Sequence, residues 1–131
     1  MIEAGVVVDR SGQPLFWHLP PGRTAASLPD SRTLWDVIWN AFKDDTLRGF
    51  AHSHPGSGVP ACSPSISDVT TFAAVEAALG RRLEWWIASS DHVALLRWSG
   101  PDKLSYRATI LTEVPSWAAE LRRLSQEGQG Q

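Results

Sequence analysis

The sequence has little cysteine, no long hydrophobic run and no excess of positive charge. Its single cysteine, Cys62, excludes an internal disulfide and a structural zinc site built from four cysteines. No stretch approaches the ~18 uninterrupted apolar residues of a membrane-spanning helix. Lysine and arginine number 12 against 14 acidic residues, and no basic run that would neutralise phosphates is present. We therefore expect no nucleic-acid or membrane partner, and any metal ion must be bound by His, Asp and Glu.

The size and composition of the chain fit one domain. At 131 residues, of which 43% are hydrophobic, the chain can fill a single core. Its N-terminal segment lacks the basic and apolar regions of a secretory signal, so we expect a cytoplasmic protein. Residues 126–131 are polar and glycine-rich, which predicts a disordered C-terminal tail after a domain over residues 1–125. We expect the seven tryptophans to fill the core, with a binding surface as the alternative.

The hydrophobic pattern predicts a mixture of strands and helices. The expected strands are residues 3–8, 14–17, 46–52, 83–88, 93–98 and 104–111. The expected helices start after a cap at Asp30 or Ser31, at Ser65, and around Pro115. Short polar turns join the last three strands, which favours an antiparallel meander. We therefore predict the α/β class, with a curved, mostly antiparallel sheet flanked by helices.

The most informative stretch is FAHSHPGSGVPACSPSISD, residues 50–68. His52 and His54 are two positions apart on a predicted strand, so their side chains point to the same face. Asp68, in the first turn of the following helix, is available as a third ligand. Two nitrogens and one carboxylate oxygen suit a catalytic zinc ion, which typically keeps a fourth position for water. The alternative is that Cys62 closes the site as a fourth ligand, which would make the zinc structural.

The same stretch contains a candidate for the stabilisation of a reacting carbonyl. Ser65 lies one helical turn before Asp68, so its hydroxyl can donate to a developing oxyanion. The alternative is that Ser65 only caps the helix, because S-x-x-D is also a capping box. A general base is needed besides, and Glu3 is the only glutamate before His52. Glu3 lies so near the start of the chain that the alternative is a frayed residue without a role. Other carboxylates remain open as the base: Asp9, Asp30, Glu76 and Glu84.

At this point the sequence resembles a known family. The letters HSHP at 52–55 and PSISD at 64–68 are similar to the signature H-x-H-P, spacer, S-x-x-D of the JAMM (JAB/MPN) zinc metalloproteases. The resemblance implies a single JAMM/MPN-like domain. It also implies hydrolysis of an amide bond in a protein or peptide, for example in a ubiquitin-like conjugate or modifier precursor.

Residue roles follow from the resemblance by position. His52, His54 and Asp68 would bind one Zn²⁺ ion. Ser65 would assist the tetrahedral intermediate, and Glu3 would act as the acid/base. These five residues are the expected site.

The sequence also allows other functions. A non-catalytic MPN-fold scaffold or binding module is the main alternative. A zinc nucleobase deaminase would need H-x-E and P-C-x-x-C, and neither is present. For a protein substrate, an extended tail can pair with a free strand edge, and the strand around Trp85 and Trp86 is one candidate for that edge.

Overall fold

The computed structural model describes residues 1–127, within which six strands, three α-helices and one short 3₁₀ helix are formed. In chain order they are β1 (Gly5–Asp9), β2 (Pro14–His18), α1 (Arg32–Lys43), β3 (Leu47–Ser53), η1 (Val59–Cys62), α2 (Ile66–Leu79), β4 (Glu84–Ala88), β5 (Val93–Trp98), β6 (Tyr106–Ile110) and α3 (Ala118–Glu127). The predicted α/β class is confirmed. The predicted tail starts too early, because Gln126 and Glu127 belong to α3; its residues 128–131 lie outside the described part. No helix within residues 1–127 combines the length and apolar character that crossing a membrane requires.

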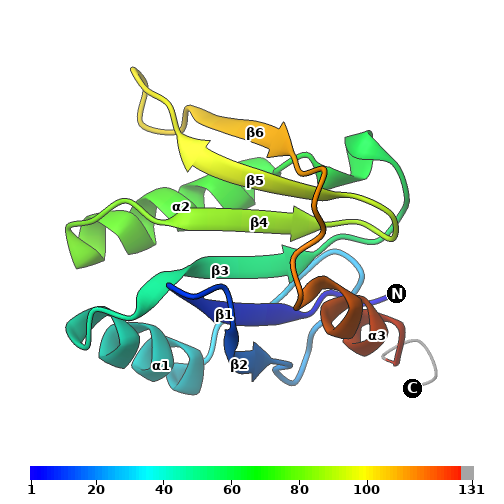
Figure 1. The fold of residues 1–131 in the computed structure, drawn as a ribbon, viewed down its shortest axis with the longest axis horizontal. Helices are drawn as coiled ribbons and strands as arrows, with labels where there is room; N and C mark the ends of the chain where they lie inside the picture. Colours follow the sequence, from blue (N-terminus) through cyan, green and yellow to red (C-terminus); the bar gives the residue numbers. More distant parts are fainter. Residues whose placement is uncertain (128–131) are drawn as a thin grey trace.

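All six strands form one sheet in the order β2-β1-β3-β4-β5-β6 (Figure 1). Every neighbouring pair is antiparallel except β3 and β4, which are parallel and are connected through η1 and α2. A parallel pair needs such a crossover, usually a helix. The predicted mostly antiparallel sheet and its closing meander are therefore confirmed. The strand with Trp85 and Trp86, a candidate for a free edge, is not one, because β4 is paired on both sides, with β3 and β5.

Helices cover both faces of the sheet (Figure 1). On one face, α1 and α2 pack in a cluster that includes Trp85 and Ile87. On the other face, α3 packs in a cluster that includes Trp86 and Trp117. Neighbouring residues of a strand point to opposite faces, so Trp85 and Trp86 fill different cores. Burial of these three tryptophans supports the predicted core role, although Trp35, Trp39 and Trp98 stay 36 to 40% exposed.

A close approach between the two parallel strands fixes the position of β3. Gly49 of β3 is paired with Glu84 of β4. A Cβ atom added at Gly49 would lie 1.7 Å from the carbonyl oxygen of Glu84. Glycine is therefore required here, because any side chain would force β3 away from β4. Three residues further along β3 lies His52.

Candidate metal centre

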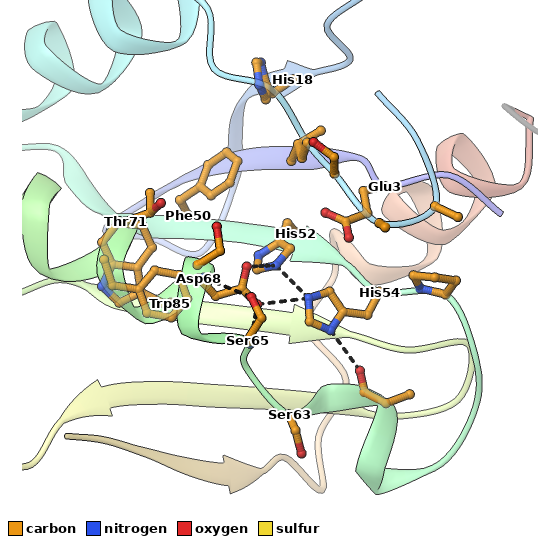
Figure 2. Close-up of a pocket in the computed structure, with 18 of the residues that line it drawn as sticks. Glu3, His18, Phe50, His52, His54, Ser63, Ser65, Asp68, Thr71 and Trp85 are labelled. Carbon is orange, nitrogen blue, oxygen red and sulfur yellow. Dashed lines mark hydrogen bonds and ion pairs between the residues drawn. The ribbon is translucent and has the colours of Figure 1, made fainter. Parts of the chain in front are cut away.

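The two histidines of the motif converge as the strand period requires. His52 belongs to β3, and His54 follows its last residue while its N–H still donates to the carbonyl of Ala88 at 2.9 Å. The backbone therefore stays extended through His54. The Nε2 atoms of the two rings lie 3.0 Å apart (Figure 2). The prediction that both side chains point to one face is confirmed.

Asp68 completes the group from the first turn of α2. Its Oδ1 lies 3.3 Å from Nε2 of His52, and its Oδ2 lies 3.1 Å from Nε2 of His54. The three residues each offer a ligand atom within 4.8 Å of the others, and no further group of this kind occurs among residues 1–127. Cys62 is not part of it: its thiol is buried and faces the carbonyl of Gly58 at 4.0 Å. The fourth-ligand alternative is therefore wrong.

A second contact orients His54 toward the centre. Its Nδ1 lies 3.1 Å from the carbonyl oxygen of Ala61 in η1, so Nδ1–H donates, and in the neutral ring the lone pair of Nε2 is left to bind a metal ion. Metal-binding histidines usually have such a partner on the other ring nitrogen, which fixes the tautomer. The donor set and this partner fit a small cation that takes nitrogen and oxygen ligands.

The electrostatics of the three residues favour a charged carboxylate. Burial raises the pKa of Asp68, but hydrogen bonds from His52 and His54 outweigh it and hold this pKa well below its usual range. Burial lowers the pKa of His54, but its hydrogen bond to Asp68 and the charges of Asp68 and Glu3 raise it overall. A proton and a metal cation would therefore compete for His54.

Ser65 is the N-cap of α2 and forms the predicted capping box. Its Oγ accepts from the N–H of Asp68 at 3.0 Å, and its own N–H donates to Oδ2 of Asp68 at 2.9 Å. The capping role is thus confirmed, and the box also holds the carboxylate in place. A serine hydroxyl can donate one hydrogen bond as well as accept. Ser65 lines the same cavity as the ligand group, so that donor can reach a bound molecule.

Glu3 is held firmly, although it precedes β1 rather than opening the first strand as predicted. Its N–H donates to the carbonyl of Thr24 at 2.8 Å, and its carbonyl accepts from Nη1 of Arg23 at 3.0 Å. The residue is only 7% exposed, so the alternative of a frayed end is wrong. Its carboxylate points toward His52 and His54 (Figure 2). Burial raises the pKa of Glu3, and the two histidines offset part of this rise.

These residues share one cavity of about 450 Å³. Glu3, Ser65, Asp68 and the two histidines all line it, so the structure brings together the full set expected from the sequence. Its remaining wall is largely apolar and includes an aromatic stack of Phe72 on Trp85, whose ring centroids are 4.4 Å apart. No lysine or arginine is among the described residues that line it.

Of the other four carboxylates considered as the general base, one lies at the cavity and three lie elsewhere. Asp30 also lines the cavity. Asp9 accepts hydrogen bonds within its own turn, from Ser11 and Gln13. The buried carboxylate of Glu76 accepts hydrogen bonds from the backbone N–H of Leu83 and the indole N–H of Trp85. Glu84 forms ion pairs with Arg48 and Arg97. Glu3 and Asp30 are therefore the two carboxylates besides Asp68 that reach the cavity.

Several residues that shape this site carry no motif in the sequence. Ala61 orients His54 through its backbone carbonyl, a group that every residue has, so its identity in the sequence gives no signal. Arg23 and Thr24 hold the backbone of Glu3 from a loop that lies 20 residues further along the chain for Arg23. His18 is buried and its Nε2 hydrogen-bonds to the carbonyl oxygen of Pro29 at 2.7 Å, and it also lines the cavity.

Comparison with known proteins adds no family assignment. The chain matches no protein-family model, and a search of curated proteins found no match. The function is therefore inferred from the motif and from the geometry of the site.

Proposed function

We propose that this protein is a zinc-dependent metallopeptidase or isopeptidase of the JAMM type, which hydrolyses an amide bond in a protein or peptide substrate. The observation that carries the proposal is the meeting of Glu3 with His52, His54 and Asp68 in one cavity. Zinc bonds to nitrogen and oxygen of ~2.0–2.2 Å place neighbouring ligand atoms of a tetrahedron about 3.3–3.6 Å apart. Here the two Nε2 atoms are 3.0 Å apart, and each lies 3.1 or 3.3 Å from a different oxygen of Asp68, so the ligand side chains would have to move slightly apart to bind zinc.

The chain's own residues divide the work of amide hydrolysis. Bound zinc would supply a water of lowered pKa and a Lewis acid for the carbonyl group. Glu3 would take the proton from the attacking water at its carboxylate and pass it to the nitrogen of the leaving amine as the C–N bond breaks. The raised pKa of Glu3 suits this role, because an acid/base works best when its pKa is near the operating pH. Ser65 would donate its hydroxyl hydrogen to the carbonyl oxygen as negative charge develops there.

The cavity lining narrows the substrate class. A free C-terminal carboxylate is usually bound by a cationic side chain or by backbone N–H groups. Within residues 1–127 no lysine or arginine lines this cavity, which already contains the carboxylates of Glu3, Asp30 and Asp68. These features favour an internal peptide bond or an isopeptide bond over the removal of a C-terminal residue. A ubiquitin-like protein as the substrate follows from the family resemblance alone.

The test is hydrolysis by zinc-loaded protein of two probes, an internally quenched peptide and ubiquitin with a C-terminal aminocoumarin amide. We expect cleavage that a chelator stops and that zinc restores. Glu3→Gln should retain zinc and lose about 10²–10⁴-fold in kcat, because only the general base is removed. Glu84→Gln is the matched control, since Glu84 pairs with arginines outside the cavity. Equal activity of Glu3→Gln and wild type would contradict the assigned base. A zinc-loaded wild type that cleaves neither probe would favour the scaffold alternative.

A further inference from the structure

A chain of buried hydrogen bonds ties the residues on both sides of Glu3 to the rest of the molecule. The N–H of Ala4 donates to Oγ of Ser53 at 2.9 Å. Oγ of Ser53 donates to Oγ of Ser125 at 3.0 Å, and Oγ of Ser125 donates to the carbonyl of Ile2 at 2.5 Å. We call this set of three bonds the serine relay. It starts one residue after Glu3 and ends one residue before it.

The donors and acceptors of the relay can be arranged in only one way. The N–H of Ala4 can only donate and the carbonyl of Ile2 can only accept, so each serine must accept one bond and donate the next. Ser53 and Ser125 are 2% and 1% exposed, so neither hydroxyl can exchange its partner for bulk water. Removing one hydroxyl would leave its buried neighbours without a partner, which is costlier than losing an exposed bond. Bonds in such a chain also strengthen one another.

The relay joins the general base to the metal-binding strand. Ser53 lies between His52 and His54 in the sequence, and its side chain points to the opposite face of the sheet, toward α3. Ser125 lies in α3, which packs on that face (Figure 1). Backbone bonds run in parallel with the relay, from Ile2 N–H to the carbonyl of Ser125 at 3.0 Å and from Ser53 N–H to the carbonyl of Ala4 at 2.9 Å.

A further contact from outside the relay acts on the same segment. Arg23 donates through Nη1 to the carbonyl of Glu3 at 3.0 Å and through Nη2 to the carbonyl of Leu124 at 3.5 Å. The backbone around Glu3 is thus attached to β3, to the last turns of α3 and to the 20–30 loop.

We propose that Ser53 and Ser125 are positioning residues, which hold the carboxylate of Glu3 at a fixed place over His52 and His54 and thereby make the site depend on α3. The catalytic part of this inference rests on the proposed function of Glu3. Neither serine touches the cavity, so each acts through the backbone of Ile2 and Ala4. A displacement of a catalytic group by ~1 Å can reduce the rate about 100-fold.

The test compares three variants with wild type. Ser125→Ala breaks the relay at its centre, and Arg23→Gln weakens the separate attachment at a half-buried side chain, where misfolding is less of a risk. Val8→Ala is the matched control: Val8 is buried on β1 on the same face as Ala4, and its side chain forms no hydrogen bond of the relay. For each protein we would measure amide hydrogen exchange at Ile2 and Ala4 by NMR, zinc affinity, and kcat and KM on the peptide probe.

For Ser125→Ala we expect exchange at Ile2 and Ala4 to become about tenfold faster, which corresponds to one lost net hydrogen bond. We expect kcat to fall about 10- to 100-fold, with zinc affinity and KM unchanged. Arg23→Gln should lower kcat in the same way. Val8→Ala should keep kcat within about twofold, because its site is distant and independent.

The outcomes separate this inference from the proposed function. Unchanged exchange in Ser125→Ala would overturn the relay. Faster exchange with wild-type kcat would overturn the positioning role, since the relay would then only stabilise the fold. An inactive wild type would contradict the proposed function, and the exchange data would still decide whether the relay holds the segment around Glu3.

Discussion

Ser65 is the N-cap of α2 and the proposed oxyanion donor, and these two roles predict effects of different size. As N-cap, its Oγ accepts one bond from the N–H of Asp68 at 3.0 Å. Replacing an N-cap serine by alanine costs about 1 kcal/mol of stability, whereas glycine costs only a few tenths. As an oxyanion donor, the hydroxyl would contribute a factor of about 10²–10³ in kcat, or about 2.7–4 kcal/mol. Capping alone therefore predicts different stabilities for Ser65→Ala and Ser65→Gly, and oxyanion donation predicts the same large loss of kcat in both.

Both variants should keep the metal ligands in place. The N–H of residue 65 still donates to Oδ2 of Asp68 in each, because that half of the capping box involves only the backbone of residue 65. Ser31→Ala is the matched control: Ser31 caps α1 and accepts from the N–H of Leu34, also at 3.0 Å, outside the cavity. It should lose about 1 kcal/mol of stability with no change in kcat.

The assay combines urea unfolding, zinc content and kcat on the peptide probe for the three variants. We expect Ser65→Ala and Ser65→Gly to retain zinc and to lose about 10²–10³-fold in kcat, with the glycine variant the more stable. A kcat that follows stability would refute the reasoning: the glycine variant would then be nearly as active as wild type, and Ser65 would be a helix cap only.

Three further predictions concern the proposed metal site and strand β3, which carries His52. Because the pKa of His54 is raised, zinc affinity should fall by up to about tenfold per pH unit below that pKa, and a chelator competition with no pH dependence would contradict this. In metal-free protein, protonated His54 should stabilise the fold below about pH 6.5, and this contribution should be lost as the pH rises through the raised pKa of His54. Thermal melts at several pH values should show this dependence in wild type and not in His54→Asn. Gly49→Ala should destabilise the fold by about 1–3 kcal/mol or more, since its Cβ would meet the carbonyl of Glu84; wild-type stability in urea would show that β3 and β4 separate without cost.

The parts of the site that the sequence predicts depend on local geometry. His52 and His54 share a face because a strand repeats every two residues, and Asp68 and Ser65 meet because a helix repeats every 3.6 residues. The alternation of polar turns and apolar runs likewise predicts the α/β class and the meander. Each of these inferences needs only residues that are close in the sequence.

The parts that the sequence does not predict depend on long-range packing. Ser125 bonds to the carbonyl of Ile2 across 123 positions, and no spacing rule links them. The composition of the strand with Trp85 and Trp86 is compatible with an edge strand and with a central strand. Its central position in the sheet follows only from its pairing between β3 and β5. Cys62 lies between the ligands in the sequence, yet η1 turns its thiol into the core instead of toward the ligands.

Metal content tests the central claim most directly. Wild type, Asp68→Asn and Asp36→Asn would be loaded with zinc, dialysed against metal-free buffer and analysed by elemental mass spectrometry. Asp36→Asn is the control, because Asp36 is a largely exposed residue of α1 that faces Arg32. The account predicts about one zinc per chain in wild type and in Asp36→Asn, and a loss of zinc in Asp68→Asn with the fold retained. Folded wild type without zinc, or equal zinc in Asp68→Asn, would contradict the assignment of His52, His54 and Asp68 as a metal centre.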